Sequence, residues 1–157
     1  MADSTSTITT AYPLPVYNFQ VDLGSDSVAF KSASGLSMGF DPITYRESQT
    51  AGGKVGPNTF RMPGMKQAVN VTLSKGYVRG TSIKYLYDWI SSTQLNVVQK
   101  QDITVRLCDQ DGNPVVTWTL QNAFPTKLSA PDFNADTNEV AIETLELLGD
   151  GLTMAES

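Results

Sequence analysis

The chain has 157 residues, of which 40% are hydrophobic and 17% are charged, and its formal net charge is −5. It contains no histidine and a single cysteine, Cys108, which excludes imidazole catalysis, histidine metal ligation, an internal disulfide and a Cys-x-x-Cys site. The acidic balance argues against specific nucleic-acid binding, which needs a basic surface.

The length fits a single domain spanning residues 1–157. Residues 1–11 are rich in Ser and Thr and lack an apolar centre, so we expect a flexible N-terminal arm and no signal peptide. The sequence also lacks a run of about 18 apolar residues, which a membrane-spanning helix requires. We therefore expect the chain to assemble in the cytoplasm.

Strand patterns begin near the N-terminus. Residues 17–23 alternate between apolar and polar side chains, which is typical of a half-buried strand. The apolar face of this strand holds Tyr17, Phe19, Val21 and Leu23. A second strand is predicted over residues 27–32 and a third over residues 40–46, where Pro42 favours a sheet edge.

Residues 48–64 form a stretch rich in glycine and proline with few apolar side chains. A loop of this length inside a compact domain is uncommon and is usually functional or disordered. Residues 69–73 then alternate again and predict another strand.

One segment has helical periodicity. Beginning at Thr81 or Ser82 and continuing to about Leu95, apolar residues recur at the spacing of a helix, with Trp89 beside them. A helix this short needs packing to be stable, so its apolar stripe should dock on a sheet. The residues expected to dock are Ile83, Leu86, Tyr87 and Ile90.

The C-terminal third returns to strand patterns. Two alternating runs, 103–107 and 116–120, flank an Asp-Gly turn and predict a β-hairpin. Near the end, the apolar parity of Val140 and Ile142 differs from that of Leu145 and Leu147, which predicts a bulge or bend around residues 143–144. The fold class is therefore mainly β, an antiparallel β-barrel or sandwich with one flanking α-helix.

Three motifs suggest chemistry that their context does not support. Residues 35–39 match the Gly-x-Ser-x-Gly nucleophile pattern, but neither a following helix nor a histidine is available. Residues 109–112 begin like a calcium loop, yet the glycine and the acidic residue needed later are misplaced. Residues 51–56 lack the spacing of a phosphate-binding loop. We predict no catalytic residue, no metal site and no cofactor.

Charge is distributed unevenly along the chain. Residues 1–45 carry one basic and four acidic side chains, residues 46–100 eight basic and two acidic, and residues 101–157 two basic and ten acidic. One interpretation is scattered, solvated charge. The other is that the basic middle of one copy meets the acidic end of a neighbouring copy.

Several short motifs occur in an order that resembles one known family, the inner-tube proteins of contractile phage tails and contractile injection systems. They are YPLPVYNF at 12–19, GLSM at 35–38, PITYR at 42–46, MPGM at 62–65, KGYVRG at 75–80, YDWI at 87–90, NAFPTK at 122–127 and EVAIETLEL at 139–147. The resemblance covers nearly the whole chain and is greatest to tube subunits of extracellular contractile injection systems. The type VI secretion tube protein Hcp resembles it as a fold relative.

This resemblance implies a structural subunit that forms hexameric rings, stacked into a hollow tube inside a contractile sheath. It implies sheath, baseplate and cap or terminator partners, protein cargo in the lumen, and a final place in an injection particle. It also implies that the 48–64 loop contacts another subunit. In a head-to-tail assembly, Lys54, Arg61 and Lys66 would then face Asp132, Asp136 and Glu139 of a neighbour.

Two alternatives remain open at this point. The chain could be the tail tube of a contractile bacteriophage, through which DNA passes. It could also be a small β-barrel module that binds a carbohydrate or another ligand, although the exposed aromatic cluster that favours such sites is missing from the pattern.

Overall fold

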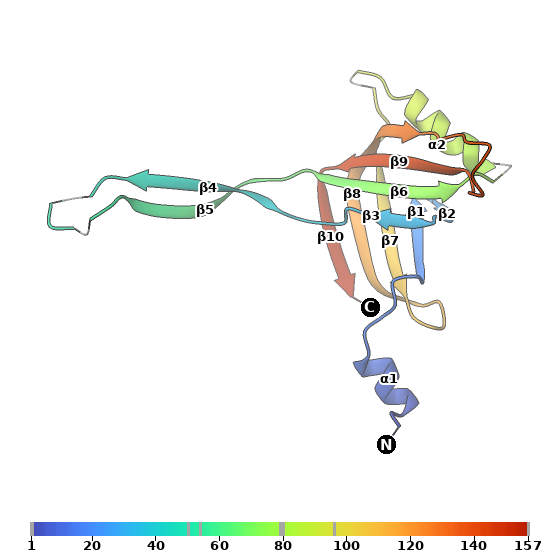
Figure 1. The fold of residues 1–157 in the computed structure, drawn as a ribbon, viewed down its shortest axis with the longest axis horizontal. Helices are drawn as coiled ribbons and strands as arrows, with labels where there is room; N and C mark the ends of the chain where they lie inside the picture. The colour runs from blue at the N-terminus through green and yellow to red at the C-terminus, as the bar shows by residue number, and fades with distance from the viewer. Residues whose placement is uncertain (1, 50, 54, 79–80, 96, 157) are drawn as a thin grey trace.

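The computed structural model describes residues 2–49, 51–53, 55–78, 81–95 and 97–156, with the backbone alone described for residues 81–84. Two antiparallel sheets form its body (Figure 1), and they share the long strand β8 (Pro114–Ser129). The strand order is β2-β1-β7-β8-β9-β6-β3, and β10 pairs with β8.

Sheet A consists of five strands, in which the first half of β8 lies between β7 and the edge strand β10. Its other strands are β1 (Phe19–Leu23), β2 (Asp26–Val28), β7 (Gln101–Cys108) and β10 (Gly151–Glu156). Sheet B consists of the second half of β8 together with β9 (Ile142–Gly149), β6 (Val69–Gly76) and β3 (Ser32–Ser34).

The strands of sheet B cross those of sheet A, as packed sheets joined by a bending strand do (Figure 1). The predicted antiparallel, mainly β fold is confirmed. Of the two forms considered, the sandwich is present, since the sheet of the described residues does not close into a barrel.

The core lies between the two sheets, where alternate side chains of each strand point inward. One row of cross-strand neighbours in sheet A is almost completely buried, and so is the facing set in sheet B. The first is Leu23, Ile103, Leu120 and Leu152, and the second is Val71, Leu73, Leu145 and Leu147. Burial of these aliphatic side chains is the main stabilising contribution to the fold.

Helix α2 (Thr81–Ser91) packs on β8 and joins the core through Leu86 and Trp89, both buried. The Trp89 indole N–H donates to the Gln99 carbonyl at 2.8 Å. Ile90 is half-buried, but Tyr87 is 61% exposed, so its predicted docking is wrong. The side chain of Ile83 lies outside the described residues.

The periodicity therefore located this helix but misjudged its buried face, because Trp89 takes the place assigned to Tyr87. The helix also ends at Ser91, earlier than the predicted end near Leu95.

The predicted N-terminal arm contains a second helix, α1 (Thr5–Ala11), which the sequence analysis missed. Ser4 caps it, because the Ser4 hydroxyl accepts the Thr7 backbone N–H at 3.2 Å. None of its residues is buried, and Figure 1 shows it standing away from both sheets.

Three strand predictions need correction. The first strand begins at Phe19, and Tyr17, assigned to its buried face, is 81% exposed. The predicted 27–32 strand is divided into β2 and β3. The bulge expected at residues 143–144 is absent, since β9 pairs with β6 in continuous register from Ile142 to Gly149. A register shift occurs instead in β8, between Pro125 and Lys127.

Candidate assembly surfaces

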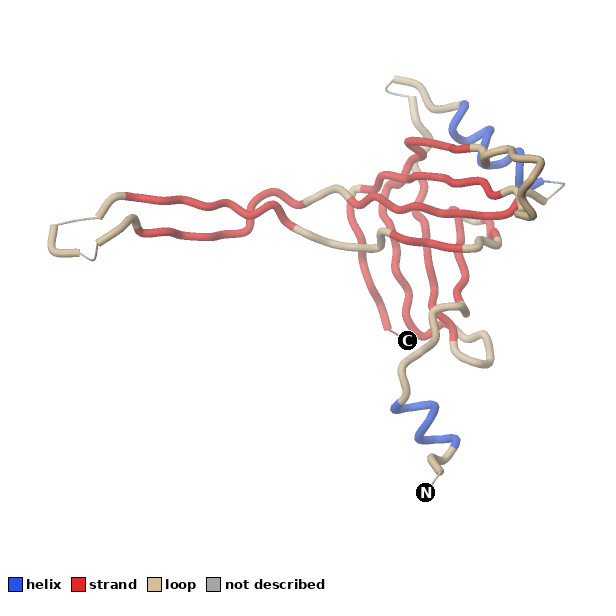
Figure 2. Tube along the Cα trace, in the orientation of Figure 1, coloured by secondary structure: helices blue, strands red, loops and turns tan. Residues whose placement is uncertain are grey.

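A two-stranded hairpin projects from the body (Figures 1 and 2) and consists of β4 (Phe40–Glu47) and β5 (Asn58–Lys66). Its strands pair with each other and with no other strand of the described residues. Nearly every residue in it is exposed, and none is buried. An isolated two-stranded hairpin has only marginal stability in water, so this arm is suited to packing against another surface.

The hairpin corrects the predicted 48–64 loop. Residues 58–64 belong to β5, and only about the first half of the predicted loop connects the two strands. Proline and glycine at 63 and 64 suggested a loop, but an exposed hairpin tolerates Pro where a central strand would not.

Pairing places the hairpin side chains on two faces of different chemistry. Ile43 pairs with Met62 and Tyr45 pairs with Phe60, and the rings of Tyr45 and Phe60 are stacked with centroids 6.3 Å apart. We call these four residues the apolar face. The opposite face carries the pairs Thr44–Arg61 and Arg46–Thr59, and we call it the cationic face.

The predicted acidic residues Asp132, Asp136 and Glu139 are all exposed in the connection between β8 and β9. A turn centred on Asn134 holds part of this segment, because the Asn134 side chain accepts the Asp136 N–H at 3.0 Å. Figure 1 shows this connection at the end of the body away from the hairpin.

The predicted basic residues occupy the hairpin. Arg61 is on its cationic face, Lys66 is the last residue of β5, and both are exposed. Lys54 lies outside the described residues. The basic and acidic sets therefore do not meet within one chain, and the ion pair found among the described residues joins Asp22 to Arg106 instead.

A buried pair of opposite charges joins the two middle strands of sheet B. Lys75 on β6 lies directly across from Glu143 on β9, and these residues are 4% and 2% exposed. The Glu143 Oε2 atom has no hydrogen-bond partner among the described residues. Burial raises the pKa of the Glu143 carboxyl, and the nearby Lys75 ammonium partly offsets this effect.

The same pair affects a tyrosine at the end of β6. Burial, together with the charge of Glu143, raises the pKa of Tyr77 above its ordinary value. The Glu143 carboxyl is enclosed within sheet B, where the residue is 2% exposed.

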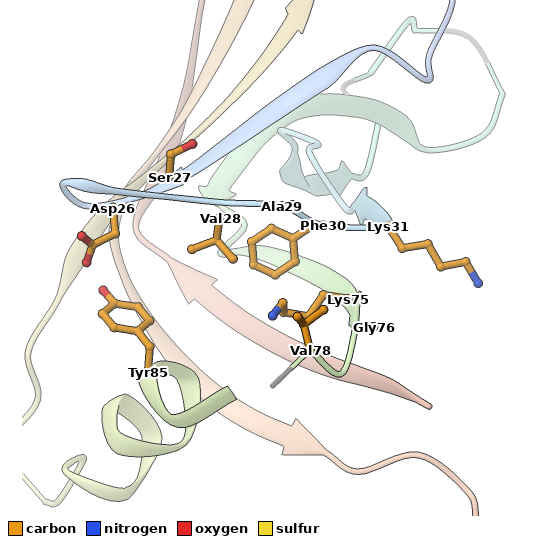
Figure 3. A pocket seen from close by; sticks show the side chains of 10 residues that line it. All are labelled: Asp26, Ser27, Val28, Ala29, Phe30, Lys31, Lys75, Gly76, Val78 and Tyr85. Carbon is orange, nitrogen blue, oxygen red and sulfur yellow. The ribbon is translucent and has the colours of Figure 1, made fainter. Parts of the chain in front are cut away.

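A cavity of about 800 Å³ adjoins Lys75, between the segment following β2, the end of β6 and helix α2. In Figure 3, Val28, Phe30, Lys75 and Tyr85 converge on one space, whereas Lys31 extends away. The Tyr85 hydroxyl also donates to the Gln101 side-chain oxygen at 3.1 Å. The lining combines apolar groups with the polar side chains of Asp26, Ser27, Lys31, Lys75 and Tyr85.

The motifs examined in the sequence have structural positions. Gly35 has a φ of +87°, and the Ser37 N–H donates to the Gly35 carbonyl at 2.8 Å in a turn before the hairpin. The Asp109 carboxylate accepts the backbone N–H groups of Asp111 and Asn113, both at 2.9 Å, inside the β7–β8 turn. Each motif serves a turn in this chain.

Over the part of the chain that the structure describes, no group of three or more acidic or cysteine side chains is arranged to hold a metal ion. None of the helices described is both long and apolar enough to cross a membrane.

Sequence reasoning missed the apolar face and the buried pair. The alternation of Phe60, Arg61 and Met62 was a strand signal that the surrounding glycine and proline residues obscured. Lys75 follows an alternating apolar run at an inward position and Glu143 precedes one, but their pairing depends on the strand register.

Comparison with known proteins gives a consistent result. Residues 15–153 match the family model described as T4-like virus tail tube protein gp19. A comparison with curated proteins gives no significant match.

Solved structures extend this match. A chain in the PVC sheath–tube complex, an extracellular contractile injection system in the extended state, is 42% identical, with a TM-score of 0.88, covering 99% of this chain and 100% of that chain. A chain in the anti-feeding prophage tube-terminating cap is also 42% identical, with a TM-score of 0.84 and complete coverage of both chains. Hcp1 from Flavobacterium johnsoniae shares the fold, at 15% identity and a TM-score of 0.53, with 90% and 97% coverage.

Proposed function

The chain belongs to the T4-like tail tube protein family and is a structural tube protein, and we propose that it forms hexameric rings stacked into the hollow inner tube of a contractile injection particle. The observation that carries this proposal is the full-length match, in sequence and fold, to a chain of a sheath–tube complex.

The shape of the subunit suits a head-to-tail assembly. In such an assembly, one surface of each copy contacts a different surface of the next copy, and the contacts can repeat without limit along a tube. The hairpin projects at one end of the body and the acidic connection lies at the other (Figure 1). This arrangement supports the proposal that the hairpin, which includes most of the predicted inter-subunit loop, reaches a neighbouring subunit.

Charge supports the same contact. Arg61 and Lys66 on the hairpin, together with Lys54 from the segment between β4 and β5 in sequence, would face Asp132, Asp136 and Glu139 of another copy. Each exposed ion pair contributes only about 0.2–1 kcal/mol. The pairs recur in every subunit of a ring, so their combined effect on stacking is larger.

Sheet A is the candidate wall of the lumen. Its side facing away from the core presents hydroxyl and amide groups, and the Asp22 and Arg106 charges there neutralise each other in an ion pair. The hydroxyl and amide residues are Gln20, Thr104, Thr117, Thr119, Gln121 and Thr153. Such a surface is hydrated and nearly neutral, so a passing polypeptide would adhere to it weakly.

The size of the bore follows from the number of strands. If β1, β7, β8 and β10 of six subunits join in one wall, the 24 strands give a backbone radius of roughly 24 Å at a tilt of about 40°. After allowance for side chains, the channel is on the order of 35–40 Å across. A folded protein of about 100 residues, roughly 34 Å in diameter, would fit.

The proposal includes sheath, baseplate and cap or terminator proteins as partners, and protein cargo in the lumen. It assigns the chain no catalytic activity and no cofactor. Assembly would take place in the cytoplasm, before the tube becomes part of an injection particle and punctures a target when the sheath contracts.

The second candidate is the tail tube of a contractile bacteriophage that conducts DNA. The family model, which describes a phage tail tube protein, favours it. The genes adjacent to this one distinguish the two, since a phage tube gene lies among genes for a capsid and for DNA packaging.

Light scattering on the purified chain tests the proposal. We expect a mass of about 100 kDa, six times the 17.0 kDa of one chain, or larger stacks of that unit. A monomer that persists throughout the micromolar range would contradict it.

A further inference from the structure

The two sheets of the sandwich differ in extent, which leaves part of the inner side of sheet A uncovered. Three rows of cross-strand neighbours cross this side, and their exposure increases from one row to the next. The row that begins at Leu23 is buried. The next row is Val21, Val105, Trp118 and Met154, and the last is Phe19, Leu107, Val116 and Glu156.

Met154, at the end of the middle row, is 60% exposed, and the apolar residues of the last row are only half-buried. We call Phe19, Leu107, Val116, Trp118 and Met154 the open floor. In Figure 1, sheet A continues beyond β3, the last strand of sheet B. A groove of about 530 Å³ lies here. It is lined by Phe19, Leu107 and Trp118 of the open floor, by Val105, by Ser32 and Ala33 of β3, and by Val16, Tyr17 and Lys31.

We propose that the apolar face of the hairpin from a second copy of this chain lies on the open floor, beside β3, and completes the sandwich. This inference rests on the proposed function, because it names the partner surface of the projecting hairpin.

The dimensions agree in both directions. Along the strands of sheet A, the last two rows cover four residues, which is about 13 Å at 3.3 Å per residue. The two strands of an added hairpin, at a spacing of 4.8 Å, would cover about 10 Å of this length. Across the floor, four strands are roughly 14–19 Å wide. The five hairpin residues from 42 to 46 are about 17 Å long.

The edge of sheet B is also available. Among the described residues, β3 pairs with β6 on one side and with no strand on the other. An extended segment can add to such an edge through main-chain hydrogen bonds, while its side chains determine which segment is accepted. A hairpin in this position would continue sheet B over the open floor.

The chemistry of the two hairpin faces determines its orientation. With the apolar face against the floor, Tyr45 and Phe60 meet Trp118 and its neighbours, which is a contact of aromatic with aromatic and aliphatic groups. Arg46 and Arg61 then remain on the solvent side, so the hairpin buries neither of these charges. The charged residues beside the floor are Lys31, which lines the groove, and Glu156, which ends the last row. The cationic face stays free for the acidic connection of a neighbour.

The occupant is a second copy and not the same chain, because Figure 1 shows the hairpin extending away from sheet A of its own chain. A ridge and a matching floor that cannot meet within one chain generate a head-to-tail contact between chains. The four side chains of the apolar face leave on the order of 300 Å² of apolar surface open, which is the size of patch that marks a binding site on a monomer.

Crosslinking the full-length chain tests this placement. The variant Met62→Cys/Met154→Cys puts one thiol on the apolar face and one on the open floor, and a short bis-maleimide then joins thiols that lie close together. The matched control, Thr44→Cys/Met154→Cys, moves the first thiol to the cationic face without removing a charge. Native Cys108 is buried, and the unchanged chain gives its background.

We expect a denaturing gel to show a ladder of covalent multimers for the test variant, at least fivefold stronger than for the control. Rings or tubes by electron microscopy without this difference would overturn the inference and leave the proposed function standing. A ladder from particles that are not six-membered would support the inference and contradict the proposed function. A reaction confined to single chains, or no reaction and no assembly, would overturn the inference.

A second pair of variants is independent of the crosslinker. Phe60→Ser removes an aromatic group from the apolar face, and Thr59→Ser makes a smaller change on the opposite face. We expect Phe60→Ser to raise the concentration needed for stacking at least tenfold, with an unchanged melting temperature for the unassembled chain. Equal stacking by the two variants would contradict the inference.

Discussion

Replacing Lys75 with Met tests the buried charge pair of sheet B. The substitution keeps an unbranched apolar side chain at a position that is 4% exposed, so it removes the charge while filling most of the space. Glu143, which is 2% exposed and lies directly opposite, then loses the positive charge beside it. Breaking a buried pair in this way costs about 3–5 kcal/mol, because it leaves a charge without compensation.

The pH dependence of this loss follows from the pKa of Glu143. Burial raises this pKa above the ordinary value of 4.5, while Lys75 lowers it. A raised folded-state pKa means that the folded chain holds the proton more tightly than the unfolded chain. The contribution of this group to the free energy of unfolding is therefore most favourable at acid pH and falls as the pH rises from about 4.5 through the folded-state pKa.

Without Lys75, the Glu143 pKa should rise further, so K75M should lose about 3–5 kcal/mol at pH 7.5 and much less near pH 4.5. Urea unfolding of the unassembled fraction, at one protein concentration, measures both values. The double variant Lys75→Met/Glu143→Leu should recover most of the loss, since it removes both charges. A loss below about 1 kcal/mol at pH 7.5, or the same loss at both pH values, would refute the reasoning.

Three other changes, a substitution, a deletion and a set of charge reversals, test separate parts of the structure. Gly35→Ala should destabilise the chain by about 2–4 kcal/mol in urea unfolding, because Gly35 has a φ of +87° and an added Cβ would lie 2.1 Å from the Asn70 carbonyl oxygen. Gly52→Ala is the control for the backbone effect alone, since Gly52 also has a positive φ but has open space around it. Deleting residues 52–58 should leave the melting temperature within a few degrees but weaken ring stacking, as the hairpin buries no side chain; an unfolded product would show that the body needs this segment. Reversal of the basic set to Glu should reduce tube growth, and an added reversal of the acidic set to Lys should partly restore it. Salt at about 0.5 M should weaken stacking of the unchanged chain. Tubes that are unaffected by either change would show that these charges are merely solvated. The basic set is Lys54, Arg61 and Lys66, and the acidic set is Asp132, Asp136 and Glu139.

The parts of the fold that sequence predicted well are those in which one face is buried in the core. Alternate apolar residues point inward in the 69–73 strand and in both strands, 103–107 and 116–120, of the predicted hairpin. The structure pairs Val105 with Trp118, as this pattern requires. In these segments, local pattern and tertiary burial agree.

The bulge predicted near residue 143 is absent because one inward position of β9 holds a charged residue and not an apolar one. Once Glu143 is allowed to face inward, opposite Lys75, the strand from Ile142 is regular and Val140 simply lies outside it. This pairing depends on the register between β6 and β9, which residue order alone does not give.

The hairpin was missed for a related reason. Its residues alternate as a strand should, but neither face is buried within the chain, so the composition resembles that of a loop. The apolar face containing Tyr45 and Phe60 has an evident role only when a second chain is considered. Assembly surfaces therefore appear in the sequence as apparent exceptions to the patterns of a monomer.

Electron microscopy of the purified chain tests the central claim most directly. We predict six-fold rings that stack into hollow tubes, with sheet A lining the bore and the hairpin of each subunit reaching another copy. Solid filaments, rings of another symmetry, or monodisperse particles of 17.0 kDa would contradict the account.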